Sequence, residues 1–148
     1  MEISPDQQEG VWYNSFPYSG EVYDMIYTAV SGADTADRLR AVVALGKSGD
    51  PRAVRPLMDL LSDADEEIRL SATIALGSLK SGRPVDELVR RLRDRSELMI
   101  IREHAAVALT NIRSTGALRG LREFALDEDE APGLRSYAGK LLKGTGHL

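Results

Sequence analysis

The feature that most constrains the fold is a segment that recurs four times along the 148-residue chain. The copies span residues 37–46, 68–77, 101–110 and 134–143 and align without gaps. Each has arginine second, alanine three residues later and leucine four residues after that. The arginines are Arg38, Arg69, Arg102 and Arg135, separated by 31, 33 and 33 residues. This period indicates stacked copies of one structural unit, because a single copy cannot bury its own apolar face.

Each copy has the spacing of an amphipathic helix. Alanine and leucine recur at i, i+3, i+4 and i+7, which places them on one stripe of the helix. The small side chains of this stripe allow a neighbouring helix to approach at the short end of the usual range, about 8–10 Å. Gly46 and Gly77 lie just past the apolar run, and the pattern predicts that they terminate their helices.

A second helix is predicted after each of the first three copies, at residues 54–61, 85–92 and 118–125. Asp50 and Pro51 precede the first of these helices as a capping residue and a proline suited to the first helical position. The same apolar pattern occurs once before the first copy, at 22–29. Residues 19–148 are therefore predicted to form a half-repeat, three helix pairs and a half-repeat. The expected fold is all-α, a right-handed α–α superhelix of about eight helices.

These residues resemble a known family of helical repeats. The pattern Ile-Arg-xx-Ala-xx-Ala-Leu-Gly, then Gly-Asp-Pro-Arg-Ala-Val-xx-Leu, is similar to the short HEAT-like repeat named after phycobilisome lyase subunits. The resemblance spans roughly residues 20–143 and is best over 36–79. The third copy departs from the pattern, with Thr110 in place of the glycine. The resemblance implies a solenoid whose second helices line a concave binding face.

Composition and charge argue against several classes of protein. The chain has no cysteine, which excludes disulfides and thiolate metal sites and favours a cytoplasmic protein. A net charge of −4 argues against nucleic acid and anionic lipid as partners. No apolar run approaches the roughly 18 residues that span a bilayer. Hydrophobic residues make up 43% of the chain, enough for a buried core.

The sequence offers little catalytic chemistry. Its two histidines are His104 and His147, and no His, Asp or Glu cluster has metal-ligand spacing. Deoxyhypusine hydroxylase, a HEAT-like enzyme, holds iron with repeated His-Glu pairs, whereas this chain has the single reversed pair Glu103-His104. No nucleophile elbow, Walker loop or dinucleotide-binding motif is present. We therefore expect a protein that is not an enzyme and holds no cofactor or metal.

Equivalent positions of the second helices stack into three surface columns. The first holds Tyr23, Arg55, Asp86 and Arg119, the second Tyr27, Asp59, Arg90 and Glu123, and the third Thr28, Leu60, Arg91 and Phe124. The alternating charges of the first two columns fit either ion pairs between repeats or a polar groove that binds a partner. The third column is the more suggestive of binding, although its positions flank the core stripe.

The recurring arginines have a structural interpretation. We expect each of them to reach an acidic or carbonyl group in the preceding loop, which would form a ladder between repeats.

Residues 1–18 do not fit the repeat and hold four of the chain's eight aromatic residues: Trp12, Tyr13, Phe16 and Tyr18. The segment has turn residues and no helical period. Two interpretations are open. The aromatic residues either cap the exposed end of the first helices or form an arm that inserts into a partner.

The function predicted from the sequence is a non-catalytic scaffold that binds a protein or peptide along its second helices. An accessory subunit of an enzyme, such as a bilin-lyase-type complex, is one alternative. Weak nucleic-acid binding, as in HEAT-like alkylation repair proteins, is another. Fold analogy alone supports both alternatives.

Overall fold

A computed structural model describes residues 19–146 of the chain. These residues form eight α-helices and one short 3₁₀-helix, with no strand among them. The elements are α2 Ser19–Ser31, α3 Thr35–Ser48, η1 Pro51–Ala53, α4 Val54–Leu60, α5 Glu66–Leu79, α6 Val85–Arg93, α7 Met99–Ile112, α8 Thr115–Leu126 and α9 Pro132–Thr145. The predicted all-α solenoid is therefore confirmed. The aromatic segment 1–18 and His147 lie outside the described residues.

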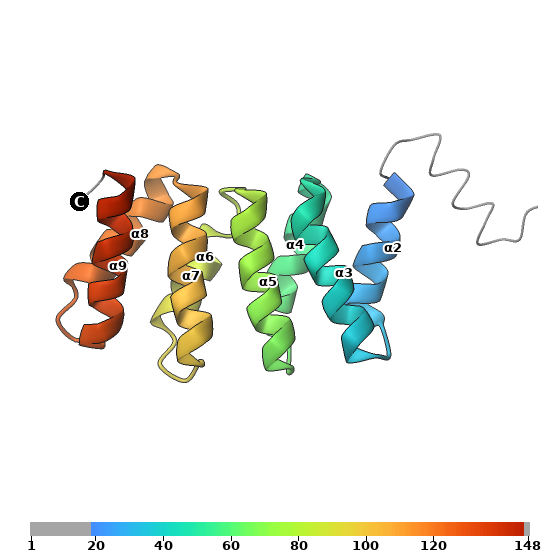
Figure 1. Cartoon of the computed structure of the whole chain (residues 1–148), viewed down its shortest axis with the longest axis horizontal. Helices are drawn as coiled ribbons and strands as arrows, with labels where there is room; N and C mark the ends of the chain where they lie inside the picture. The colour runs from blue at the N-terminus through green and yellow to red at the C-terminus, as the bar shows by residue number, and fades with distance from the viewer. Residues whose placement is uncertain (1–18, 147–148) are drawn as a thin grey trace, which may run out of the picture.

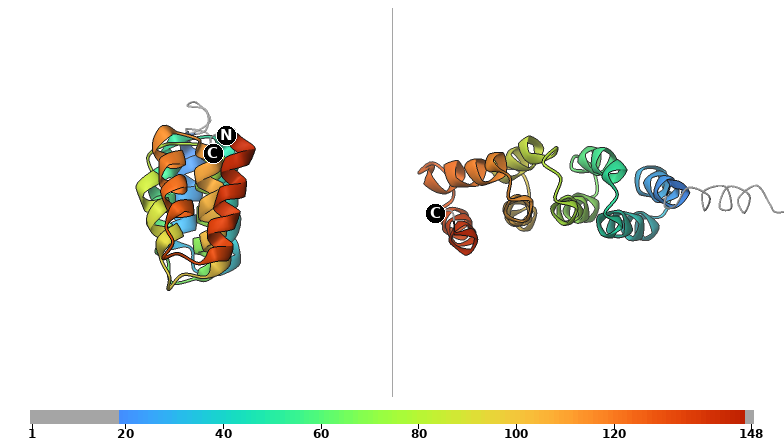
Figure 2. Two further views of the ribbon diagram at one scale, coloured as in Figure 1. Left: turned by 90° about the vertical axis from the view of Figure 1, so that its left-hand side faces the viewer. Right: turned by 90° about the horizontal axis from the view of Figure 1, so that it is seen from above.

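The helices form two layers that advance along one axis from α2 to α9 (Figure 1). One layer holds the first helices of the repeats, α3, α5, α7 and α9, and the other holds the second helices, α2, α4, α6 and α8 (Figure 2). The buried side chains lie between the layers in one continuous core. Repeat alanines and leucines such as Ala72, Leu76, Ala105 and Leu109 are fully buried there.

Local sequence accounts for most helix starts. Asp34 and Asp65 cap α3 and α5 by accepting backbone N–H bonds, as Ser114 does for α8. Asp50 accepts from the Arg52 N–H, and Pro51 opens the 3₁₀ turn that leads into α4.

The predicted helix ends at Gly46 and Gly77 are wrong. Both glycines lie inside their helices and are buried, and a Cβ on Gly46 would lie 2.8 Å from the Ala75 Cβ of the next repeat. A Cβ on Gly77 would lie 2.9 Å from the Ala108 Cα. The glycines are therefore required for close contact between first helices, and α3 ends instead at Ser48, followed by Gly49 as the C-cap with a φ of 67°.

Candidate interaction surface

The first two predicted columns lie exposed on the second-helix layer. Tyr23 and Tyr27 of α2 are 52% and 71% exposed. The charged members of these columns, Arg55, Asp59, Asp86, Arg90, Arg119 and Glu123, are exposed as well. A hollow of about 360 Å³ lies between α4 and α6, lined by Arg55, Met58, Asp59, Ser62 and Glu87. The fold therefore presents a row of tyrosine and charged side chains with a recess in its middle.

The charges of these columns pair within helices rather than between repeats. Arg55 and Asp59 are 3.8 Å apart on the same face of α4. Arg90 pairs with Glu87 one turn earlier on α6. Positions three or four apart on a helix are neighbours, so each of these side chains has an oppositely charged partner on its own helix. These columns therefore do not supply the ion pairs between repeats that the alternating charges suggested. The charged groups of their side chains remain exposed to solvent.

The third column is mostly interior, which corrects its assignment as a binding surface. Leu60 is 5% exposed and Phe124 is fully buried. Both lie beside the core stripe, where the packing of the two layers covers them. Arg91 is half-buried, and its guanidinium lies 3.3 Å from Glu97 and 3.4 Å from Asp94. These residues stabilise the repeat, and a partner on the surface does not reach Leu60 or Phe124.

A cation–π contact anchors the tyrosine end of the surface. The Arg52 guanidinium lies 5.2 Å from the centre of the Tyr23 ring. Asp50 holds this guanidinium through an ion pair of 2.5 Å, and the hydrogen bond from Arg52 lowers the pKa of the Asp50 carboxyl. The sequence columns missed Arg52, because it belongs to the 3₁₀ turn before α4 and not to the helix.

The recurring arginines bind the ends of neighbouring helices. Arg38 donates to the Ala29 carbonyl at 2.9 Å, and Arg102 donates to the Leu92 carbonyl at 2.8 Å. Arg135 donates to the Ala125 carbonyl at 3.2 Å. Carbonyl groups at helix C-termini lack an intrahelical partner, so these bonds satisfy the end of the preceding second helix.

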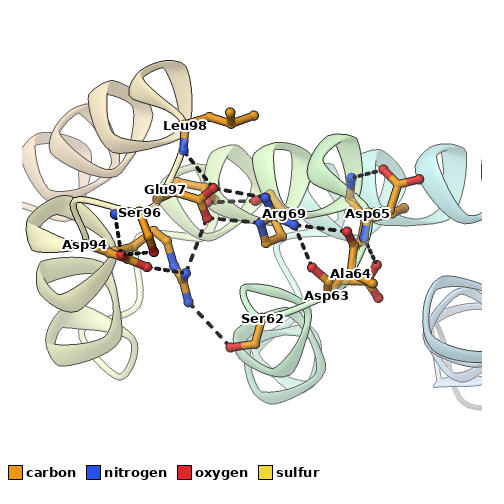
Figure 3. Close-up of polar contacts among 12 residues, drawn as sticks. Ser62, Asp63, Ala64, Asp65, Arg69, Asp94, Ser96, Glu97 and Leu98 are labelled. Atoms are coloured by element: carbon orange, nitrogen blue, oxygen red, sulfur yellow. Dashed lines mark hydrogen bonds and ion pairs between the residues drawn. The ribbon is translucent and has the colours of Figure 1, made fainter.

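The expected contact with the preceding loop occurs in Arg69, which donates to the Asp63 and Ala64 carbonyls at 2.9 and 3.2 Å. The carboxylate partners of Arg38, Arg69 and Arg102 lie instead in the loop that follows each repeat. Arg38 pairs with Asp63 at 2.5 Å, and Arg102 pairs with Glu130 at 3.3 Å. Arg69 donates through two nitrogens to both oxygens of Glu97, each at 3.0 Å (Figure 3). Each pair therefore joins the first helix of one repeat to the loop that leads into the next, 25 or 28 residues later.

Glu97 has the most buried side chain of these three carboxylates and lies between two arginines. Burial raises the pKa of the Glu97 carboxyl, but hydrogen bonds from Arg69 and from the Leu98 N–H, together with the charges of Arg69 and Arg91, outweigh burial and lower it. Glu97 is thus ionised at neutral pH, and its negative charge is matched by two guanidinium groups. The network is a structural junction between repeats.

The described residues contain no group of three or more His, Asp or Glu side chains that could hold a metal ion. His104 lies half-buried on α7, with its Nδ1 2.8 Å from the Ile100 carbonyl. Within residues 19–146, no helix is long and apolar enough to cross a membrane.

The sequence profile of the family described as HEAT repeats matches residues 24–100. This match spans more than half of the chain. The chain belongs to the HEAT repeat family. The phycobilisome-lyase type of repeat, which the sequence pattern resembles, remains an expectation.

Among solved structures, the chain is similar to human deoxyhypusine hydroxylase in complex with glycerol, with a TM-score of 0.74 and 23% sequence identity. The similarity covers 86% of this HEAT repeat chain and 44% of the enzyme, so the chain spans less than half the length of that protein. At this identity the likeness shows the fold alone. No curated protein matches the chain.

Proposed function

We propose that this HEAT repeat protein is a non-catalytic cytoplasmic scaffold that binds a protein or peptide segment along its second helices. The observation that supports the proposal is the recess between α4 and α6, which is lined by the exposed Arg55, in a second-helix layer that also presents the exposed Tyr23 and Tyr27 on α2. Tyrosine and arginine are enriched at binding hot spots because they combine apolar area with hydrogen bonding.

The charges at this surface favour a polar partner segment. Arg55 and Asp59 are about 70% exposed, so little desolvation is needed before they exchange their mutual contact for one with a partner. Tyr27 supplies an exposed ring close to the same row. A bound segment would contact the tyrosines at one end and the α4–α6 recess in the middle.

Two substitutions with matched exposure test the proposal. Arg55→Glu alters the proposed surface, whereas Arg40→Glu alters an equally exposed arginine of α3, which likewise pairs with a carboxylate on its own helix. Affinity capture from native lysate with each full-length variant identifies partners by mass spectrometry. We expect Arg55→Glu to lose partners that wild type and Arg40→Glu retain. Equal partner sets for all three proteins would refute the proposed surface.

A second candidate, which rests on fold analogy alone, is an accessory role beside an enzyme. In that case the captured partner is an enzyme, and adding the purified HEAT protein changes the rate or specificity of that enzyme. The nucleic-acid alternative predicts a salt-dependent shift of a DNA probe, which the scaffold proposal does not.

A further inference from the structure

The first turn of α7 has an unusual run of three exposed aliphatic residues. Leu98, Met99 and Ile100 are 41%, 47% and 45% exposed. The equivalent residues of α5, 33 positions earlier, are the acidic run 65–67, in which the aspartate caps the helix. Leu98 makes no such capping bond. Acidic residues stabilise a helix start and aliphatic residues exposed to water do not, so this exchange indicates a role outside the fold.

Met99 also lines a hollow of about 490 Å³ between α7 and α9. Leu134 and Tyr137 contribute apolar walls from α9, and Glu103 and Lys140 stand at its polar edge. Tyr137 is 37% exposed, so its ring is open to a ligand on this side. The hollow belongs to the first-helix layer and is separate from the second-helix surface described above.

The repeat sequence explains why the hollow lies at the contact between α7 and α9. We call the contact between two successive first helices a seam. The seams α3–α5 and α5–α7 each have a glycine of one helix against an alanine of the next. At the α7–α9 seam the equivalent residues are Thr110 and Leu141, each 33 positions after its counterpart. Their larger side chains prevent the close approach that Gly77 and Ala108 allow, so α9 packs less tightly on α7.

The charged residues at the edge of the hollow indicate which charges a bound partner would carry. Glu103 of α7 and Lys140 of α9 form no ion pair with any residue in the described range 19–146. We propose that the α7–α9 hollow is a docking site for a segment of a partner protein. This segment inserts one large apolar side chain between Met99 and Tyr137. It carries a basic residue next to Glu103 and an acidic residue next to Lys140, because these charges complement the two edges.

A repeat-swap variant separates binding from folding. Leu98→Asp with Met99→Glu and Ile100→Glu gives α7 the first turn of α5, which forms a capped helix in the same fold. The matched control is Ile74→Glu, which removes an aliphatic residue that is 45% exposed on α5, away from the hollow. The probe is a phage-displayed library of random dodecapeptides, selected on the wild-type full-length chain.

We expect the selected peptides to share a large apolar residue flanked by a basic and an acidic residue. Their affinity for the swap variant should fall at least about tenfold, a loss typical of a binding hot spot, while the Ile74→Glu control binds as wild type does. The melting temperature of the swap variant should not fall below that of wild type.

Three outcomes would overturn the inference. The first is that the selected peptides bind the swap variant as tightly as wild type. The second is a clear drop in the melting temperature of the swap variant, which would make the aliphatic turn a structural element. The third is that wild type self-associates in sedimentation velocity and the swap variant does not, since the hollow would then contact a second copy of the chain.

Discussion

The guanidinium of three of the four repeat arginines, Arg38, Arg69 and Arg102, binds both a backbone carbonyl and a carboxylate. In Arg38 and Arg102 the Nε donates to a helix-end carbonyl while a terminal nitrogen binds a carboxylate from the next loop. The planar, forked geometry of arginine directs donors on separate nitrogens to both groups, whereas lysine has all its donors on one nitrogen. The recurrence of arginine is therefore explained by the connection between successive repeats.

Arg69→Ala tests this role at the residue scale. The substitution leaves the buried Glu97 carboxylate with only Arg91 as its cationic partner, so we expect the free energy of unfolding to fall by about 2–3 kcal/mol. Urea unfolding followed by circular dichroism measures the change. Arg40→Ala, at a 71% exposed arginine, is the control and should change stability by less than about 0.5 kcal/mol. An unchanged unfolding midpoint for Arg69→Ala would exclude a stabilising role for the junction.

At the scale of the elements, small residues set how closely the first helices pack. Gly46 against Ala75 and Gly77 against Ala108 leave no space for a further side chain. Glycine in a helix interior costs roughly 0.5–1 kcal/mol relative to alanine, so its retention at these two positions indicates that helix contact outweighs helix propensity.

Gly77→Val should therefore destabilise the protein. The new side chain would collide with the Ala108 backbone, and we expect a loss of roughly 1–3 kcal/mol from overpacking, measured by thermal or urea unfolding. Gly139→Ala is the opposite control, because no atom lies within 4 Å of the added Cβ on α9. That substitution should stabilise the fold by roughly 0.5–1 kcal/mol. The prediction fails if Gly77→Val unfolds at the wild-type midpoint.

At the scale of the whole molecule, the solenoid is held by a continuous apolar core and by charged junctions between successive repeats. Each junction contains an arginine of one repeat and a carboxylate of the following loop. These contacts join neighbours only, so stability is expected to depend on every junction along the stack.

The junctions predict how stability changes with pH. The pKa values of Asp63 and Glu97 are lowered in the folded protein, from ordinary values of 3.8 and 4.5, because the arginine contacts outweigh burial. Carboxyl groups of this kind stabilise the fold above their unfolded pKa, and that stability is lost as the pH falls through the folded pKa. The melting temperature should hold steady down to about pH 5 and fall below about pH 4.5. Glu97→Gln should weaken this acid dependence, and a melting temperature constant from pH 6 to pH 3 would contradict the assignment.

The sequence alone determined the helical solenoid, because hydrophobic period and repeat spacing are local properties of the chain. The cap at Asp65 and the Asp50-Pro51 turn could also be predicted from the sequence, because each acts on backbone groups two or three residues away. Only the tertiary structure decided that Gly77 is a contact residue, that Phe124 is interior and that Glu97 is the partner of Arg69. These outcomes depend on the distance and rotation between neighbouring helices, which the period of a single helix does not specify.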